Sequence, residues 1–156
     1  MGAPIHIAAA APDNYEWCAR VMAASEPWIT LGRDFVACRA ALARPGTELF
    51  VARDIIAGDQ ERPSGFILVA PHGLAGSPYI ASIAVAAEAR GHGVGSELLR
   101  FAEQHFAGRE HLFLLVSSFN LRAGQFYRRH GYELVGELKD YIVPGQSELI
   151  LHKRLA

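Results

Sequence analysis

The sequence has few cysteines and no cluster of metal-binding side chains. Its 156 residues include two cysteines, Cys18 and Cys38, which form no Cys-x-x-Cys pair. No group of Cys and His residues has the spacing of a zinc site. We therefore expect a reduced, metal-free cytoplasmic protein in which both cysteines are small buried hydrophobic residues.

The chain also lacks a long hydrophobic run and an excess of basic residues. Charges and glycines interrupt every apolar stretch before the roughly 20 residues that a membrane-spanning helix needs. The short apolar run near the N-terminus has no basic region ahead of it, and we expect a strand there. Lys and Arg number 15 against 16 Asp and Glu. This balance argues against nucleic acid as a partner, and nothing in the sequence indicates a membrane partner.

Hydrophobic residues, by contrast, are plentiful, at 51% of the chain against 20% charged residues. That proportion is enough to bury one sizeable core. The sequence contains no internal repeat, no low-complexity tract and no long linker. We expect one domain over residues 1–156.

Hydrophobic periodicity and turn residues predict a mixed α/β chain with the element order βααβββαβαββ. Polar residues from Gly58 to Ser64 are expected to connect two of the strands as a hairpin. The helices are expected from 13 to about 25, after Gly32 up to about 44, from 96 to 106, and from 120 to 129. The strands are expected at 5–10, 48–54, 65–70, 79–85, 111–116, 132–138 and 148–152.

A glycine-rich loop joins the strand at 79–85 to the following helix and reads Arg90-Gly91-His92-Gly93-Val94-Gly95. Unpaired backbone N–H groups and the positive end of the helix dipole suit such a loop to a diphosphate. A Rossmann loop would need glycine at Ser96, and the P-loop lysine is absent. The loop alone fits a phosphate site and an ordinary glycine-rich connection equally well.

This Arg-x-x-Gly-x-Gly pattern resembles the signature of the GNAT family of acyl-CoA-dependent N-acetyltransferases. A second segment, Asn120 to Tyr132, reads NLRAGQFYRRHGY and is similar to the family's Asn-x-x-Ala-x-x-Phe-Tyr-x-x-x-Gly-Phe/Tyr helix. The close match spans Ile83 to Tyr132, and the rest agrees only in the order of elements. The resemblance implies a mixed, mostly antiparallel central sheet of about seven strands flanked by about four helices.

The resemblance also implies acetyl-CoA as the cofactor, with coenzyme A as the product. Backbone N–H groups of the glycine loop would hold the pyrophosphate, and the strand at Ile83 would pair with the pantetheine arm. Ser96 and Asn120 fit helix capping equally well. The implied cofactor-binding residues are Ile83, Val85, Arg90, Gly91, His92, Gly93, Val94, Gly95, Ser96, Asn120 and Tyr127.

Two groups are candidates for the chemistry of transfer. Tyr127 matches the family's usual general acid, and a phenol of pKa about 10 can protonate a departing thiolate of pKa about 8.5 once both are desolvated. Its alternative role is a core tyrosine beside Phe126. The backbone N–H of Ile83 is the candidate oxyanion donor.

The sequence does not identify a general base. Some family members carry a glutamate on the strand before the glycine loop, whereas this strand has Tyr79 at the comparable position. Five other titratable side chains are candidates for the general base, acting directly or through water, although each is expected at the surface. They are Glu48, His72, Glu137, Asp140 and Glu148.

In this family the acceptor amine usually binds between two loops, here EPWITLGR and KDYIVPGQS. Trp28, Thr30 and Arg33 offer an aromatic wall, a hydroxyl and a cation, which suit a small substrate with a carboxylate. Asp140 and Tyr141 would complement a cationic amine from the other side. A core tryptophan and a solvated arginine explain the first group equally well.

The sequence therefore predicts an acetyl-CoA-dependent N-acetyltransferase acting on a primary amine by direct attack in a ternary complex. The sequence leaves the acceptor open among peptide N-termini and small molecules such as amino acids, polyamines and antibiotic amines. It also leaves open whether the protein forms a homodimer. One alternative is a non-catalytic acyl-CoA-binding or regulatory module. Another is a nucleotide-binding protein that uses the glycine loop.

Overall fold

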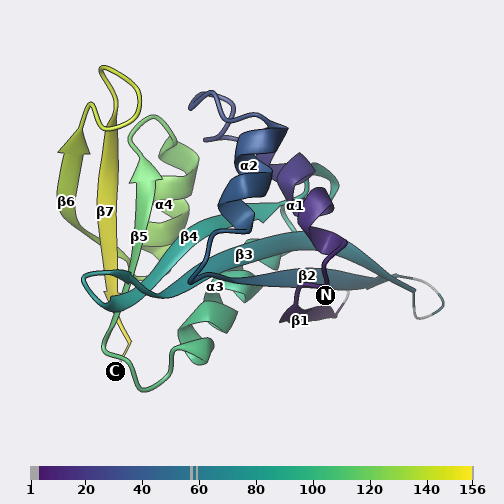
Figure 1. The fold of residues 1–156 in the computed structure, drawn as a ribbon. Coiled ribbons are helices and arrows are strands. Elements are labelled where there is room, and N and C mark those ends of the chain that lie inside the picture. Colours follow the sequence, from purple (N-terminus) through teal and green to yellow (C-terminus); the bar gives the residue numbers. More distant parts are fainter. Residues whose placement is uncertain (1–3, 57, 59, 156) are drawn as a thin grey trace.

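The structure is a computed structural model, which describes residues 4–56, 58 and 60–155. Its element order confirms the predicted βααβββαβαββ, with one short 3-10 helix added (Figure 1). In chain order the elements are β1 (Ile5–Ala9), α1 (Asn14–Ala23), α2 (Phe35–Leu42), β2 (Glu48–Ile56), β3 (Gln60–Leu74), β4 (Ser77–Val85), η1 (Ala87–Ala89), α3 (Val94–His105), β5 (His111–Ser117), α4 (Leu121–Arg129), β6 (Glu133–Lys139) and β7 (Ser147–Arg154).

Several expected boundaries were wrong. Strands β2, β3 and β7 end at Ile56, Leu74 and Arg154 rather than at 54, 70 and 152, and the starts of α3 and β3 also differ. Helix α3 begins at Val94 rather than Ser96, because Gly93 at φ +84° is already its N-cap. Strand β3 begins at Gln60, so residues 60–64 are not the expected connection. They extend the hairpin because Gln60 still pairs with Ile56 of β2. Asp59 of that connection lies outside the described residues.

The seven strands form one sheet in the order β1-β2-β3-β4-β5-β7-β6. All neighbours are antiparallel except β4 and β5, whose parallel pairing covers only Tyr79 with Phe113 and Ile80 with Leu114. Beyond that point β4 and β5 diverge toward their C-terminal ends (Figure 1).

A β-bulge in β4 lies at the place where this pairing stops. Leu68 of β3 pairs with Ser82 and Val69 pairs with Ile80, which leaves Ala81 without a partner on β3. A bulge of this kind bends a strand and increases its local twist. We infer that the bulge at Ala81 directs the rest of β4 away from β5.

The helices cover the two faces of the sheet with two separate hydrophobic clusters (Figure 1). Helices α1 and α2 pack with residues that include Cys18, Cys38 and Phe66 on one face. Both cysteines are at most 1% exposed, which confirms that they are buried hydrophobic residues. Helices α3 and α4 pack on the other face through residues such as Leu98 and Tyr127.

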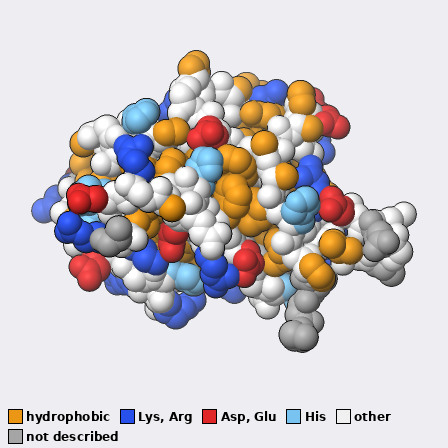
Figure 2. Space-filling view, turned by 90° about the horizontal axis from the view of Figure 1, so that it is seen from below, with side chains coloured by type: hydrophobic (Ala, Val, Ile, Leu, Met, Phe, Trp, Pro, Cys, Tyr) orange, Lys and Arg blue, Asp and Glu red, His pale blue; other side chains and the backbone are white. Residues whose placement is uncertain are grey.

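The α3 side of the molecule also carries hydrophobic side chains at its surface, among His and charged residues (Figure 2). Phe50 of β2 and Phe101 of α3 pack there with ring centroids 4.8 Å apart, and the His105 ring lies 5.0 Å from Phe50. Within the described residues, no helix has the length and apolar character of a membrane span.

Gly65 of β3 allows α3 to approach the sheet closely. A Cβ atom at this position would lie 2.8 Å from the Ala84 carbonyl oxygen and 3.1 Å from side-chain atoms of Val94 and Leu98. The carbonyl oxygen belongs to the neighbouring strand and has little freedom to move. The position of the first turn of α3, and therefore of the glycine loop before it, depends on the absence of a side chain at Gly65.

We predict that Gly65→Ala lowers the free energy of unfolding by about 2 kcal/mol, because the added methyl group overpacks the contact between α3 and the sheet. Gly124→Ala is the matched control, since Gly124 lies in α4 and a Cβ there meets nothing within 4 Å. It should raise the free energy of unfolding by about 0.5–1 kcal/mol through helix propensity. Urea denaturation measures both, and equal effects would contradict the packing argument.

Candidate functional site

Two adjoining cavities open where β4 and β5 diverge. The glycine-loop cavity has a volume of about 830 Å³. It is lined by the end of β4, by Arg90, Gly91 and Gly93 of the loop, by the first turn of α3, by one face of α4 and by the segment after α1. The inter-strand cavity, of about 700 Å³, lies between the α1–α2 connection, β4, β5 and Glu148 of β7. Both cavities share the lining residues Glu26, Ile83, Asn120, Ala123 and Tyr127.

The three loop glycines are needed for different reasons. Gly91 and Gly93 have φ of +81° and +84°, and a Cβ atom at either would meet nothing within 4 Å. Their requirement is therefore conformational, since other residues rarely adopt this region. A Cβ on Gly95 would instead lie 3.3 Å from the ring of Phe126, so this glycine allows α3 and α4 to pack closely.

The first turn of α3 presents backbone donors to the glycine-loop cavity. The bond from Glu97 N to Gly93 O, at 3.0 Å, is the first of the helix. The N–H groups of Val94, Gly95 and Ser96 therefore lack intrahelical acceptors, and the positive end of the helix dipole lies beside them. All three residues line the cavity. This open cradle of donors fits an anionic diphosphate.

Arg90 lines the same cavity and also braces the loop. Its Nε donates to the Val85 carbonyl at 3.1 Å, and one terminal nitrogen donates to Ser25 Oγ at 3.2 Å. These bonds connect the glycine loop to the end of β4 and to the residues after α1. His92 does not line either cavity, and its Nδ1 lies 3.3 Å from the Ala89 carbonyl oxygen.

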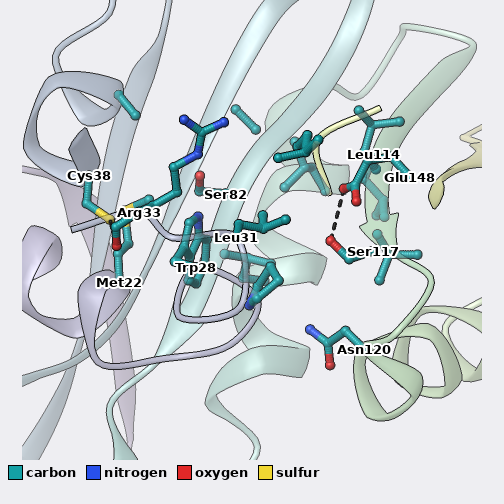
Figure 3. A pocket seen from close by; sticks show the side chains of 18 of the residues that line it. Met22, Trp28, Leu31, Arg33, Cys38, Ser82, Leu114, Ser117, Asn120 and Glu148 are labelled. Atoms are coloured by element: carbon teal, nitrogen blue, oxygen red, sulfur yellow. Dashed lines mark hydrogen bonds between the residues drawn. The ribbon is translucent and has the colours of Figure 1, made fainter. Parts of the chain in front are cut away.

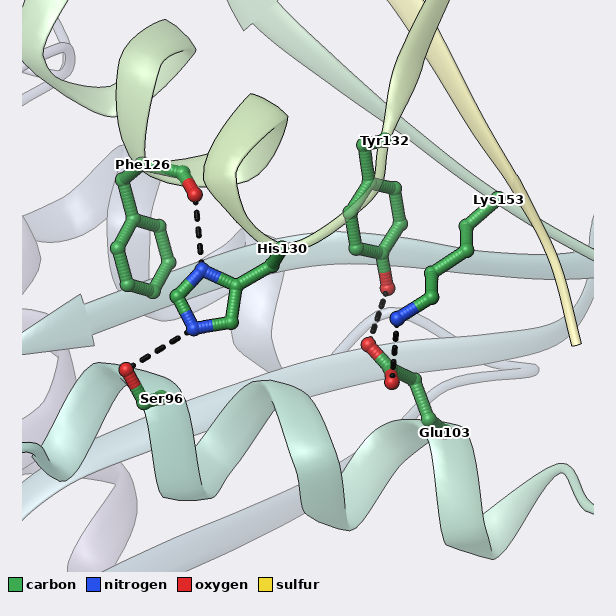
Figure 4. Close-up of polar contacts among 6 residues, drawn as sticks. All are labelled: Ser96, Glu103, Phe126, His130, Tyr132 and Lys153. Carbon is green, nitrogen blue, oxygen red and sulfur yellow. Dashed lines mark hydrogen bonds and ion pairs between the residues drawn. The ribbon is translucent and has the colours of Figure 1, made fainter.

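Ser96 makes a side-chain contact that sequence reasoning missed. His130, after the end of α4, has Nδ1 2.8 Å from the Phe126 carbonyl and Nε2 3.0 Å from Ser96 Oγ (Figure 4). A carbonyl only accepts, so Nδ1 donates to Phe126, and Nε2 pairs with the serine hydroxyl, which can both donate and accept. Ser96 therefore joins α3 to α4 through His130.

A second polar contact joins α3 to the C-terminal part of the sheet. Glu103 accepts a hydrogen bond from the Tyr132 hydroxyl at 3.0 Å and another from Lys153 Nζ at 2.9 Å (Figure 4). Tyr132 is 2% exposed, and the ion pair is partly buried. Together with His130, this clamp holds α4 and β7 against the helix that begins at the glycine loop.

Tyr127 and Tyr79 place two phenols in the inter-strand cavity. Burial raises the pKa of Tyr127 above its usual value, with a smaller contribution from Tyr79. Burial likewise raises the pKa of Tyr79 to about 12. Asn120 caps α4 by accepting from the Ala123 N–H at 3.4 Å, which confirms its predicted capping position.

Glu148 was expected at the surface, and the structure shows that this was wrong. The residue is 6% exposed and lines the inter-strand cavity. Ser117, its cross-strand partner on β5, donates to Oε1 at 3.0 Å (Figure 3). Burial raises the pKa of Glu148, and the Ser117 hydrogen bond opposes that shift. Nothing local in the sequence signals this pairing, because it depends on the register between β5 and β7.

The other four candidate bases line neither cavity. Glu48 Oε1 lies 3.2 Å from His105 Nε2, and His72 Nδ1 lies 3.3 Å from the Gly76 carbonyl oxygen. Glu137 accepts from Ser147 Oγ at 2.6 Å, and Asp140 accepts from the Gly145 N–H at 2.6 Å.

The predicted acceptor residues are brought together only in part. Trp28, Arg33 and Tyr79 line the inter-strand cavity, whereas Asp140 and Tyr141 do not. Thr30 also lies outside the lining, and both its backbone N–H and its hydroxyl bond to the Glu26 carboxylate. Trp28 and Arg33 face the cavity opposite Glu148 (Figure 3).

Sequence comparison identifies a family and a curated relative. The family model described as Acetyltransferase (GNAT) family matches residues 11–132. An uncharacterized N-acetyltransferase of Methanocaldococcus jannaschii is 33% identical over 82 residues, which are 51% of this chain and 53% of that protein. The match therefore spans about half the length of this relative.

Solved structures with the same fold cover nearly the whole chain. A Desulfovibrio desulfuricans protein described as an acetyltransferase of the GNAT family has a TM-score of 0.78 at 18% identity, covering 98% of this chain and 100% of that one. An aminoglycoside 6'-N-acetyltransferase in complex with coenzyme A has a TM-score of 0.73 at 16% identity, with 97% of each chain covered. A nourseothricin acetyltransferase is 30% identical, with a TM-score of 0.62 over 72% of this chain and 67% of that chain.

We predict that Glu103→Ala lowers the free energy of unfolding by about 2 kcal/mol, because it leaves Tyr132 and Lys153 without their shared acceptor. Tyr132→Phe removes one hydrogen bond only and should cost about 1 kcal/mol. Chemical denaturation of both variants tests the clamp. A cost for Glu103→Ala no larger than that of Tyr132→Phe would show that the ion pair contributes nothing.

Proposed function

Because this chain belongs to the GNAT acetyltransferase family, we propose that it transfers the acetyl group of acetyl-CoA to a primary amine by direct attack in a ternary complex. The observation that carries this proposal is the junction of the two cavities at Ile83 and Tyr127. A diphosphate cradle adjoins a cavity for a second substrate there. The proposal covers residues 1–156 as one acetyltransferase domain of a cytoplasmic protein.

The residues of the glycine-loop cavity fit coenzyme A. The N–H groups at the start of α3 suit the pyrophosphate. The open space around Gly91 and Gly93, where an added Cβ would meet nothing within 4 Å, leaves room for it. Beyond Ile80, the edge of β4 that faces β5 pairs with no strand in the described part of the chain. The backbone at Ile83 and Val85 is therefore available to pair with the pantetheine arm. When bound, the cofactor supplies an acetyl group activated as a thioester.

Tyr127 is proposed as the general acid. Its side chain is 8% exposed and lines both cavities. Because burial raises its pKa, the phenol keeps its proton through neutral and moderately alkaline pH. The same desolvation raises the pKa of a thiolate leaving beside it, so the hydroxyl remains matched to sulfur as a proton donor. The backbone N–H of Ile83 is the proposed donor to the carbonyl oxygen.

The two cysteines are not suited to act as nucleophiles. Burial raises the pKa of Cys18 to about 12, and Cys18 lines neither cavity. Cys38 lines the inter-strand cavity but is 1% exposed, and burial also raises its pKa. Only the thiolate attacks efficiently, so direct transfer to the amine needs no acyl-cysteine.

The acceptor is proposed to be a small amine that enters the inter-strand cavity. The structural neighbours include a nourseothricin acetyltransferase, an aminoglycoside 6'-N-acetyltransferase and a spermidine/spermine N-acetyltransferase from Vibrio cholerae. Trp28 and Arg33 give this cavity an aromatic wall and a cation. Amino acids and peptide N-termini therefore remain in the acceptor class, together with polyamines and antibiotic amines.

The function is tested by calorimetric titration with acetyl-CoA, with desulfo-CoA, ATP and NAD as controls, followed by thiol release with a panel of amines. Micromolar binding selective for the CoA compounds, with amine-dependent thiol release, supports the transferase. Binding without turnover would favour a non-catalytic acyl-CoA module. Binding of ATP or NAD that acetyl-CoA does not displace would indicate a nucleotide site.

We predict that Gly93→Asp weakens acetyl-CoA binding at least tenfold, because it adds negative charge and side-chain bulk beside the pyrophosphate. Gly108→Asp is the matched control. Gly108 has φ +92° with nothing within 4 Å of an added Cβ, and it lines neither cavity. Calorimetry compares the two, and equal affinities would place the diphosphate elsewhere.

We predict that Tyr127→Phe reduces kcat about 100-fold and leaves acetyl-CoA affinity nearly unchanged, because it removes only the proton donor. Tyr132→Phe is the control, since its ring lies 6.1 Å from that of Tyr127 but lines neither cavity. Steady-state rates from pH 7 to 9 measure the effect. Wild-type rates for Tyr127→Phe across this range would exclude Tyr127 as the acid.

A further inference from the structure

The inter-strand cavity contains a buried carboxylate whose surroundings do not neutralise its charge. Glu148 is 6% exposed, and its one side-chain hydrogen bond in the described part of the chain comes from the neutral Ser117 hydroxyl. No Lys, Arg or His among residues 4–56, 58 and 60–155 lies within 4.0 Å of its carboxylate. A buried carboxylate without a cation is costly to the fold, so the residue needs a role other than stability.

The place of Glu148 relates it to the transfer chemistry. It lines the same cavity as Tyr127, and Tyr79 interacts electrostatically with both residues. Tyr127, Tyr79 and Glu148 line one and the same cavity. An amine that enters this cavity as far as the junction at Tyr127 therefore shares the cavity with both the phenol and the carboxylate.

The only other carboxylate among the described residues that line this cavity is already engaged. Glu26 is exposed, and its two oxygens accept from the backbone N–H and the hydroxyl of Thr30. Glu148 is thus the carboxylate with acceptor capacity left for a ligand. The other charged or titratable groups among the described residues that line this cavity are Tyr79, Tyr127, Cys38, Arg33 and Arg44. Tyr141 lies outside the lining and acts electrostatically on Tyr79.

Resting on the proposed function, we propose that Glu148 binds the protonated acceptor amine and removes its proton before attack. Ser117 is the positioning residue, because its hydroxyl donates to one carboxylate oxygen, Oε1, and we assign the other oxygen to the ligand. The acceptor class that matches this group is a basic alkyl amine, which at neutral pH is almost entirely an ammonium ion.

The protons balance in this scheme. The ammonium ion carries three protons and the amide product carries one. Glu148 takes the first proton and passes it through the cavity to solvent. The second leaves nitrogen as the C–N bond forms and the C–S bond breaks, and it replaces the proton that Tyr127 gives to sulfur.

The main test is Glu148→Gln, which keeps an oxygen to accept from Ser117 and removes the charge. We expect kcat/KM for a basic amine such as spermidine, or whichever amine of the panel gives the highest rate, to fall about 100-fold. Acetyl-CoA affinity and the thermal midpoint should not fall. Glu137→Gln is the matched control, because Glu137 lies on the neighbouring strand β6 and lines neither cavity. A Glu148→Gln rate within twofold of wild type would overturn the proposal.

The pH dependence gives a second test, which a purely structural role would not affect. Protonated Glu148 accepts no proton, so kcat/KM of the wild type should fall as pH decreases through the Glu148 pKa. Because the Ser117 hydrogen bond lowers that pKa, Ser117→Ala should move this acidic limb to higher pH. An unmoved limb would contradict the assignment.

The Glu148 pKa also provides a readout that is independent of turnover. In the free protein, ¹³C NMR titration of the Glu148 carboxyl carbon should show a pKa above that of ordinary glutamate, and Ser117→Ala should raise it further. An ordinary value would overturn the role of Glu148 whether or not an amine is acetylated. If no amine of the panel is acetylated although Glu148 titrates as expected, the proposed function fails instead.

Discussion

The site depends on the interruption of one pairing within the sheet. Among the strands that the structure describes, β4 and β5 are the only parallel neighbours, and their pairing ends after Tyr79 and Ile80. The unpaired Ala81 follows at once. If β4 had continued straight, its backbone N–H and C=O groups would have paired with β5, and no opening would lie between the two strands. The bulge instead leaves a strand edge with open hydrogen-bonding groups, and both cavities meet along it.

The elements around this opening are held by contacts of different kinds. Close packing places α3 on the sheet, because Gly65 has no side chain to separate β3 from Val94 and Leu98. Polar contacts then hold α4 and β7 to α3 through His130 and Glu103. Packing against the sheet and hydrogen bonds to α4 and β7 thus hold α3 in place. They keep the backbone N–H donors at the start of α3 in a fixed arrangement.

Burial distinguishes the carboxylates of this chain more clearly than their sequence positions do. Glu48, Glu137 and Asp140 have partners outside the two cavities. Glu148 is enclosed with a neutral hydroxyl, and burial raises its pKa. The same enclosure keeps the Tyr127 phenol protonated. The proposed acid–base transfer depends on these two groups, the carboxylate and the phenol, lining one cavity.

Local patterns in the sequence were enough to predict the order of the elements and the glycine loop. The turn at Gly91 and Gly93 and the cap at Asn120 depend on residues close in the chain, so their chemistry is readable from a short segment. The resemblance of two motifs to one family extended this to the family itself, which the comparisons confirm.

Only the tertiary structure decided which distant residues meet. The bulge at Ala81, the space that Gly65 leaves for α3, and the pairing of Ser117 with Glu148 all depend on register between strands. Register is set by the summed packing of whole faces rather than by any local signal. For that reason the sequence determined the glycine loop, whereas the fold alone separated the buried Glu148 from the four other candidate bases, Glu48, His72, Glu137 and Asp140.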